Sequence, residues 1–419
     1  MKPGFLKQAT GQRAKHHLMM VTHVLPYPPA AGNEIRIYKM LRWLRKQGYG
    51  MTLVLKPLGD EEVPNECVAG LRDVVDNLYI FDNRVIPRPA GASARTAAQI
   101  DSDLEDARLT ELQDGFCPAW FVDEVAAIAA AVRPDVVIAQ YVFMSRLLTL
   151  PECADALRVI DAHDLFCRKQ ATVEQYGIKD YGLSLTDEQE RKLLLRADAI
   201  LAIQRVEQDE LAALVPEREA LLTSFDLEVH HADPARMVPA RVLIVASGNE
   251  FNVRGTQDFL SYTWPLIKAS NPDAHLHVIG RVCSEVWCDD PSVSLLGFVE
   301  SLEREYEEAQ VVVNPCRVGT GLKIKTIEAL AWGKAHVAWP SAADGLRELA
   351  DVPVLIATNV VDFASAICSI LDDNARRESL QRTAHAFIGE YFEASNVYRS
   401  FTGAIDNCRI LETEEAHVE

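Results

Sequence analysis

The stretch that decides the fold is residues 314–333, which read NPCRVGTGLKIKTIEALAWG. It follows three valines at residues 311–313, whose β-branched side chains are typical of a buried strand. A loop with Gly319 and Gly321 comes next, and residues 324–332 then show the apolar spacing of an amphipathic helix. A strand, a glycine loop and a helix in this order are typical of α/β proteins.

The same stretch has the groups needed to bind an anion. A glycine loop that leads into a helix leaves backbone N–H groups free, and the helix dipole adds to their attraction for negative charge. The nearby cations are Arg317, Lys323 and Lys325. The carboxylate of Glu328 can accept hydrogen bonds from both hydroxyls of a ribose, so the combination predicts a nucleoside diphosphate ligand. The alternative is an ordinary α/β turn with solvated lysines.

The composition limits the class of protein. A chain of 419 residues can form two domains, and its 48% hydrophobic and 25% charged residues are those of a globular protein. A net charge of -19 argues against a nucleic-acid partner. Because no window approaches the roughly 18 apolar residues of a membrane span, we expect a cytoplasmic protein, with peripheral membrane contact left open. Residues 1–16 are predicted to be a flexible leader.

The 9 cysteines are scattered and include no C-x-x-C pair. This spacing favours reduced, structural thiols over a disulfide framework or a zinc site. Cys283 and Cys288 are close in sequence but have no second pair of ligands near them. We therefore predict neither a metal site nor a cofactor.

The first half of the chain begins with a strand–loop–helix–strand pattern, residues 17–22, 25–33, 34–44 and 51–55, which predicts a parallel sheet. Gly32, in the proline-rich loop, lets the backbone turn beside a ligand; the alternative is a rigid turn without one. His163 directly follows a predicted strand at residues 159–161, where it can hydrogen-bond a sugar or accept a proton, or serve only a structural role.

The remaining pattern defines the domains. Residues 17–215 form a first Rossmann-like domain, 216–240 a linker, 241–390 a second domain with the same alternation, and 391–419 a last helix and tail. We expect two doubly wound domains that face a central cleft. The pattern weakens over residues 57–118, of which we interpret residues 84–109 as an insertion or mobile excursion and Asp101-Ser-Asp103 within it as solvated.

These landmarks resemble the retaining GT-B glycosyltransferases, of the glycosyl transferases group 1 type. Residues 25–32 are similar to the group's first glycine loop, residues 159–164 (VIDAHD) to its active-site histidine segment, and residues 197–200 (ADAI) to a strand entry near the end of its first domain. Residues 252–255 (NVRG) are similar to its diphosphate loop, and residues 315–333 to its nucleotide-sugar signature.

The resemblance implies a role for each matched residue. Glu328 would bind the donor ribose, Lys325 and Arg254 the diphosphate, Gly32 would offer a backbone N–H, and His163 would lie beside the transferred sugar. The donor loop would be completed by Arg317, Gly319, Thr320, Gly321 and Lys323. Two departures are visible: Thr320 stands where the group often has an acid, and the diphosphate loop has Arg254 but no lysine.

The implied function is transfer of a sugar from a nucleoside diphosphate sugar to an acceptor hydroxyl with retention of configuration, in polysaccharide or glycoconjugate biosynthesis. The acceptor is a glycan, a lipid-linked sugar or a small molecule. Closure of the two domains would exclude water from the donor. Three alternatives remain: a nucleotide-sugar epimerase, a phosphorylase, which needs pyridoxal phosphate, and a non-catalytic nucleotide-sugar-binding partner.

Overall fold

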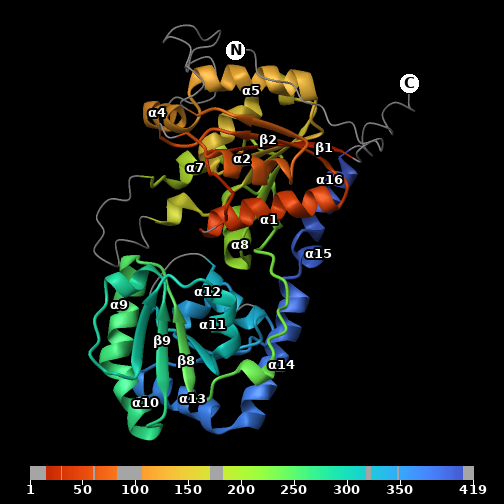
Figure 1. The fold of residues 1–419 in the computed structure, drawn as a ribbon. Helices are drawn as coiled ribbons and strands as arrows, with labels where there is room; N and C mark the ends of the chain where they lie inside the picture. The colour runs from red at the N-terminus through yellow and green to blue at the C-terminus, as the bar shows by residue number, and fades with distance from the viewer. Residues whose placement is uncertain are drawn as a thin grey trace. The chain divides into compact units, whose positions relative to one another are not determined.

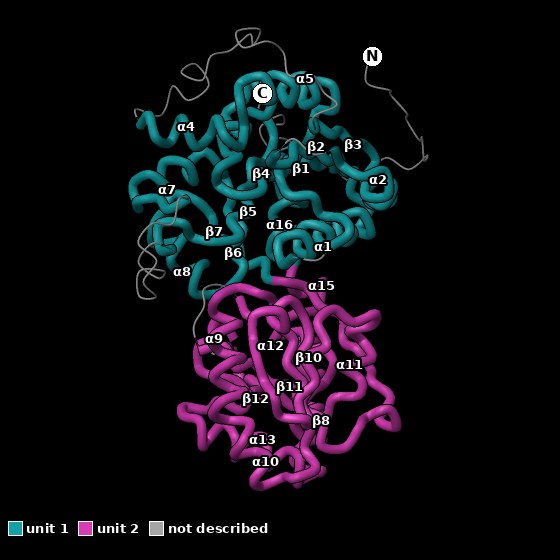
Figure 2. Tube along the Cα trace, turned by 60° about the vertical axis from the view of Figure 1, so that its left-hand side comes forward, with its two compact units in different colours: residues 1–224, 398–419 teal, residues 225–397 magenta. Residues whose placement is uncertain are grey.

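The computed structural model describes residues 16–29, 31–59, 62–82, 106–169, 183–317, 322–346 and 349–408. The chain forms two compact units (Figure 2): unit 1 is residues 1–224 with 398–419, and unit 2 is residues 225–397. The chain therefore passes from unit 1 to unit 2 after Ser224 and returns to unit 1 at Tyr398.

Unit 1 is built on a parallel sheet of seven strands in the order β3-β2-β1-β4-β5-β6-β7. The strands are β1 (His17–Thr22), β2 (Gly50–Leu55), β3 (Asn77–Ile80), β4 (Val136–Gln140), β5 (Leu157–Asp161), β6 (Ala199–Ala202) and β7 (Glu219–Leu222). The helices are α1 (Gly32–Lys46), α2 (Asn65–Arg72), α4 (Ala107–Phe116), α5 (Ala119–Val132), η1 (Val142–Thr149), η2 (Pro151–Cys153), α7 (Asp187–Leu194), α8 (Arg205–Leu214) and α16 (Arg399–Asn407).

Helices cover both faces of this sheet, with α5 on one face and α1 on the other (Figure 1). Successive strand residues point to opposite faces, so Met19 and Val21 of β1 share a core with Phe121 and Val125 of α5. β4 is buried at every residue and β1 at all but its first, which explains their continuous apolar sequences.

Unit 2 is built on a parallel sheet of six strands in the order β10-β9-β8-β11-β12-β13. The strands are β8 (Arg241–Val245), β9 (His275–Ile279), β10 (Val293–Gly297), β11 (Val311–Asn314), β12 (Ala335–Ala338) and β13 (Val354–Ile356). The helices are η3 (Pro234–Arg236), α9 (Glu250–Asp258), η4 (Phe259–Thr263), α10 (Trp264–Ser270), η5 (Arg281–Ser284), α11 (Leu302–Glu308), α12 (Ile324–Ala331), η6 (Pro340–Ala343), α13 (Val360–Asp372), α14 (Asn374–Tyr391) and α15 (Ala394–Val397).

Both sheets are doubly wound, which confirms the predicted fold class. The strand order reverses between β1 and β4 in unit 1 and between β8 and β11 in unit 2. Open α/β sheets bind ligands at the carboxyl ends of their strands at this switch point. The fold therefore directs attention to the loops after β1 and β4 in one unit and after β8 and β11 in the other.

Several elements differ from the sequence predictions. The predicted linker, residues 216–240, contains β7, and α9 begins at Glu250, so residues 252–255 lie in a helix and not in a loop. Short edge strands such as β7 have few buried side chains, so their apolar pattern is weak.

Other predictions concern residues outside the described part of the chain. These include nearly all of the leader at residues 1–16 and both acids of Asp101-Ser-Asp103. All nine cysteines are free thiols. No single helix of the described residues has the length and apolar character needed to cross a membrane. Taken together, α4 and α5 reach that length and apolar character, but they are bent by 62° where they meet.

Candidate functional site

The loop after β11 in unit 2 is held by side-chain hydrogen bonds at its start. Asn314 Oδ1 accepts from the N–H of Cys316 at 3.2 Å, and Asn314 Nδ2 donates to Thr326 Oγ1 of α12 at 3.1 Å. Thr326 Oγ1 in turn donates to the carbonyl of Ala342 at 2.8 Å, and Ser341 Oγ donates to the carbonyl of Cys316 at 3.2 Å. The polar residues of the quoted stretch therefore fix where α12 begins.

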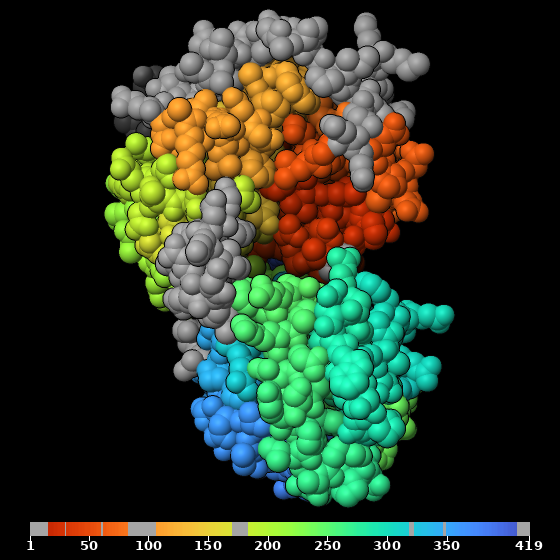
Figure 3. Space-filling view, turned by 90° about the vertical axis from the view of Figure 1, so that its left-hand side faces the viewer, coloured from red at the N-terminus to blue at the C-terminus, as the bar shows by residue number. Residues whose placement is uncertain are grey.

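Helix α9 packs directly against this loop because one of its residues has no side chain. A Cβ atom on Gly255 would lie 2.6 Å from the carbonyl oxygen of Pro315 and 3.0 Å from Cα of Cys316, so only glycine fits. The preceding residue, Arg254, is exposed and makes no hydrogen bond or ion pair with another described residue. Helix α9 lies on the face of unit 2 shown in green in Figure 3, so its outer side is open to solvent.

Lys325 and Glu328 form an ion pair in the first turns of α12. Lys325 Nζ lies 2.8 Å from Glu328 Oε2, and the two side chains are 40% and 19% exposed. Tyr306 of α11 is buried and its hydroxyl donates to the same carboxylate oxygen at 3.4 Å. Burial and the Glu328 carboxylate raise the pKa of Tyr306 well above its usual value, so it remains a neutral donor.

The other predicted donor residues lie around the start of α12. The guanidinium carbon of Arg317 lies 4.4 Å from the ring centroid of Trp339, which orients an otherwise exposed side chain. Lys323 is the N-cap residue of α12, and its carbonyl accepts from the N–H groups of Thr326 (2.9 Å) and Ile327 (3.2 Å). Gly319, Thr320 and Gly321 lie outside the described residues.

In unit 1, the predicted residue Gly32 is the first residue of α1, not part of a loop. The N–H of Ala31 before it donates to Glu34 Oε2 at 2.8 Å, which closes the first turn of the helix. Asn33, the next residue, donates from Nδ2 to the hydroxyl of Tyr141 at 3.1 Å. The start of α1 is therefore tied to the residue that follows β4.

His163, which follows β5, is held in place on two sides. Its ring stacks on Tyr141 at 4.1 Å with an angle of 8°, and Nε2 lies 2.6 Å from Gln140 Oε1. An amide oxygen only accepts hydrogen bonds, so Nε2 has the hydrogen and Nδ1 is left as an acceptor. His163 and Tyr141 both have positive φ angles, 59° and 68°. Such strain at two stacked residues is typical of a functional site.

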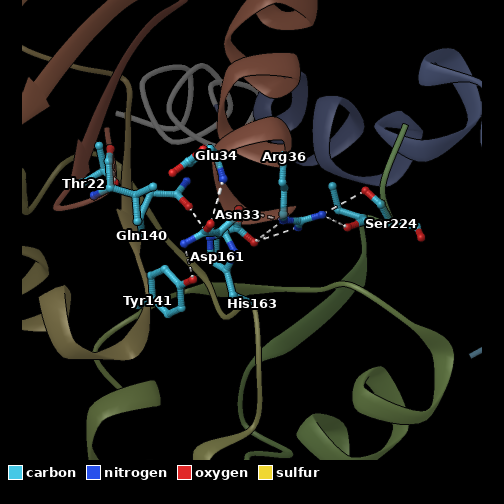
Figure 4. A network of polar contacts seen from close by, with 11 residues as sticks. Thr22, Asn33, Glu34, Arg36, Gln140, Tyr141, Asp161, His163 and Ser224 are labelled. Atoms are coloured by element: carbon cyan, nitrogen blue, oxygen red, sulfur yellow. Dashed lines mark hydrogen bonds and ion pairs between the residues drawn. The ribbon is translucent and has the colours of Figure 1, made fainter. Parts of the chain in front are cut away.

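Asp161 links His163 to a buried arginine (Figure 4). Arg36 of α1 binds the Asp161 carboxylate through Nε (3.1 Å to both oxygens) and Nη2 (2.7 Å), and Asp161 Oδ2 lies 3.6 Å from His163 Nε2. Arg36 Nη1 also donates to the carbonyls of Thr223 (2.7 Å) and Ser224 (2.9 Å). All three guanidinium nitrogens of Arg36 therefore donate to an acceptor.

Burial controls the charges in this network. It lowers the pKa of His163 to about 4 against the opposing effect of Asp161, so the imidazole is neutral at neutral pH. Burial alone would raise the pKa of Asp161, but Arg36 outweighs it and the carboxylate stays ionised. His163 can therefore make neutral hydrogen bonds to a ligand without changing the charge of the site.

Four partners of the predicted residues were not expected from sequence patterns: Arg36, Gln140, Tyr141 and Tyr306. Gln140 is the last residue of β4 and Tyr141 follows it, and this position at the carboxyl end of a strand is a signal that could have marked both. Arg36 is 125 residues from Asp161, and nothing in the local sequence connects them. Within the described part of the chain, no three His, Cys, Asp or Glu side chains are grouped as metal ligands.

Comparison with known proteins bears on the family and the fold. Residues 239–373 match the family described as Glycosyl transferases group 1. Solved structures with the same fold include sucrose-phosphate synthase from Thermosynechococcus elongatus, with 16% identity and a TM-score of 0.59 over 93% of this chain and 100% of the other. Another is HepE from Anabaena in complex with UDP, with 12% identity and a TM-score of 0.63 over 93% and 99%.

A third similar structure is a TarM variant from S. aureus in a complex that contains UDP, with 10% identity and a TM-score of 0.62 over 93% of this chain and 99% of the other. Comparison with curated protein sequences gives no match. The chain has the GT-B fold, and the family match over most of unit 2 supports a GT-B glycosyltransferase.

Proposed function

We propose that this protein transfers a sugar from a nucleoside diphosphate sugar to an acceptor hydroxyl, with retention of anomeric configuration. The observation that carries the proposal is the Lys325–Glu328 pair at the start of α12, next to the β8/β11 switch point and inside the family match. A cation and a carboxylate one turn apart suit the two halves of a nucleoside diphosphate. Glu328 is assigned to the ribose hydroxyls and Lys325 to the diphosphate.

Binding of the donor changes the partner of Lys325. Without a ligand its ammonium neutralises Glu328, and a diphosphate offers it a stronger anionic partner. Tyr306 then remains as a donor to Glu328, so this carboxylate is still oriented when Lys325 turns to the phosphates. Arg254 supplies a second cation from α9, and the residues around the donor loop, Arg317, Gly319, Thr320, Gly321 and Lys323, complete the site.

The chemical step separates charge between the sugar and the departing diphosphate. Fixed cations and N–H groups near the diphosphate stabilise this separation, and we propose that Arg254 and Lys325 do so without a metal ion. In unit 1, Gly32 offers a backbone N–H and His163 a neutral imidazole with a free acceptor at Nδ1. His163 is thus assigned to a sugar hydroxyl, and retention follows the group that the sequence resembles.

The two similar structures that contain UDP make uridine diphosphate sugars the first donors to test. The first experiment is a thermal-shift screen of the protein with UDP-sugars and their guanosine and adenosine counterparts. A donor at about 100 times its dissociation constant adds roughly 2.7 kcal/mol to the stability of the folded state. Stabilisation by none of these donors would exclude the proposed function.

The decisive variant is Glu328→Ala, which removes the ribose acceptor. We expect it to weaken donor binding about tenfold to a hundredfold, because a charged acceptor is lost. The matched control is Glu188→Ala, which breaks a similar Lys–Glu helix pair in unit 1, with Lys192, outside the candidate site. Equal donor affinity in both variants would remove Glu328 from the site. Release of an altered sugar without any acceptor would favour an epimerase.

A further inference from the structure

Four polar side chains follow neighbouring strands of unit 1 in one row. In the sheet order β2, β1, β4 and β5, the residues just after each strand are Lys56, His23, Tyr141 and, two residues on, His163. The N–H of Lys56 donates to the carbonyl of Thr22 at 3.0 Å, which places Lys56 beside His23 across the strand pair. The ring of Tyr141 lies 5.1 Å from His23 and 4.1 Å from His163. The row therefore runs without a break along the carboxyl edge of the sheet.

Lys56 stands at one end of the row without a counter-ion. It is half-buried and makes no side-chain hydrogen bond or ion pair with another described residue. The acid after the neighbouring strand β3, Asp82, accepts instead from the N–H of Val63 at 2.9 Å. Burial lowers the pKa of Lys56, because the desolvation of its ammonium is not offset by a nearby carboxylate. A half-buried cation of this kind favours an anionic ligand.

His23, next in the row, also has an unused polar atom. Its Nδ1 is buried without a partner in the described part of the chain, and its ring lies against Phe116 at 4.9 Å. Burial lowers the pKa of His23 to about 4, with His163 and Lys56 acting in the same direction, so its imidazole is neutral. A neutral imidazole can donate one hydrogen bond and accept one, which suits a hydroxyl or an anion beside it.

We propose that Lys56 and His23 form a subsite for an anionic substituent of the acceptor, a phosphate or a carboxylate. The subsite lies at the opposite end of the row from His163, which is assigned to the transferred sugar. Three interstrand spacings separate the two ends, roughly 14 Å, a span that about one or two sugar rings fill. The inference rests on the proposed function only in calling the ligand an acceptor. The anion site itself is independent of donor binding.

The simpler explanation for Lys56 is that its aliphatic stem covers the core while its ammonium reaches water. That explanation predicts no ligand and no effect of an anion on His23. The two explanations therefore differ in a property of unit 1 that can be measured without any donor.

The test uses the full chain with 13C-labelled histidine and follows the His23 ring by NMR, assigned with His23→Gln. The probes are glucose 6-phosphate, glucuronate and uncharged glucose. We expect at least one of the two anions to shift the His23 resonance at millimolar concentration, and glucose to have no effect. The comparison of the two anions identifies phosphate or carboxylate as the preferred group.

The variant Lys56→Met keeps the length of the side chain and removes its charge. We expect it to weaken the anion effect about tenfold to a hundredfold, and Lys56→Arg to retain most of it. The matched control is Lys46→Met, at an exposed lysine of α1. Circular dichroism checks that the variants fold. If Lys56→Met does not fold, Lys56→Arg still tests whether a cation at this position supports the anion effect.

Two results would overturn the proposal: no shift of His23 with either anion at tens of millimolar, or equal shifts in the wild type and Lys56→Met. The variant Arg254→Met, in unit 2, distinguishes a failure of the anion subsite from a failure of the proposed function. It is expected to weaken UDP binding and to leave the effect of the anions on His23 unchanged. A protein that binds no nucleotide but shows the anion effect would retain the subsite and lose the transferase assignment.

Discussion

The candidate residues of the two units are organised in opposite ways. In unit 1, Arg36 and Asp161 are almost fully buried, and the Gln140–His163 hydrogen bond holds the ring in place, while Gln140 Nε2 is left without a partner among the described residues. In unit 2, Arg254 is exposed, and within the described part of the chain Lys325 has the partly exposed Glu328 as its one partner. Buried side chains that are hydrogen-bonded to one another are held in place before a ligand arrives, whereas exposed cations are free to exchange partners. The predicted residues of unit 1 are therefore fixed in place, whereas the cations of unit 2 can change partners.

The largest effect is expected from breaking the buried pair in unit 1. Asp161→Asn leaves the Arg36 guanidinium buried without its counter-ion, which typically costs about 3–5 kcal/mol of stability. Urea unfolding followed by circular dichroism measures the loss. The control is Asp187→Asn, which breaks the exposed pair with Arg168 and should cost less than about 1 kcal/mol. Similar losses in the two variants would contradict the difference between buried and exposed charge.

The second effect concerns the exposed cation of unit 2. Arg254→Met should leave folding unchanged and weaken the binding of UDP by about 2 kcal/mol, because one charge-assisted contact to the diphosphate is lost. Isothermal titration calorimetry at low and high salt measures both the loss and its screening. Arg304→Met, at an exposed arginine of α11 in the same unit, is the control. Unchanged UDP affinity in Arg254→Met would exclude this arginine from the diphosphate site.

The third effect is a dependence on pH that arises in the buried network. The pKa of His163 is near 4 in the folded chain and near 6.5 when the ring is in water. As the pH falls below about 6.5, the unfolded chain binds a proton that the folded chain does not, so stability is lost between about pH 6.5 and about pH 4 and is constant above this window.

His163→Gln should remove about 1–2 kcal/mol of the stability difference between neutral pH and about pH 5, as measured by urea unfolding at both values. The exposed His231 provides the control variant His231→Gln. The test is the change in the difference between the two free energies of unfolding. A general loss of packing would lower the free energy of unfolding equally at both pH values.

The smallest effect is expected at Tyr141. Tyr141→Phe keeps the ring that stacks on His163 and removes the hydroxyl that accepts from Asn33. The loss should be about 1 kcal/mol or less, the net contribution of one hydrogen bond. Tyr141→Ala removes the stacked ring as well and should cost more in the same unfolding measurement. Equal losses in the two variants would show that the stack does not support His163.

Much of the fold could be predicted because its elements have strong local patterns. The valines of β11 and the amphipathic residues of α12 fall within one residue of their predicted positions. β7 was missed because two of its four residues are only partly buried and one is exposed. β13 has three residues and one of them is exposed, which is too little for a periodic signal.

The candidate site could be predicted only in part, for a physical reason. Lys325 and Glu328 are three residues apart on one helix, so their pairing follows from helical geometry. The partners of His163 come from other strands, and contacts between distant segments leave no trace in a single sequence. The assigned roles of Gly32, His163, Lys325 and Glu328 remain predictions until ligands are bound.

The missing side chain of Gly255 has one further consequence. Because the carbonyl of Pro315 occupies the place of a Cβ atom, α9 and the loop after β11 are locked together at a single contact. The hydrogen bond between Asn314 and Thr326 ties α12 to the same loop, so the backbones at Arg254 and Lys325 are held at a constant separation while their exposed side chains can still turn. A constant separation of this kind suits one length of phosphate chain. On the proposed function, unit 2 should therefore bind a nucleoside diphosphate more tightly than the corresponding monophosphate or triphosphate.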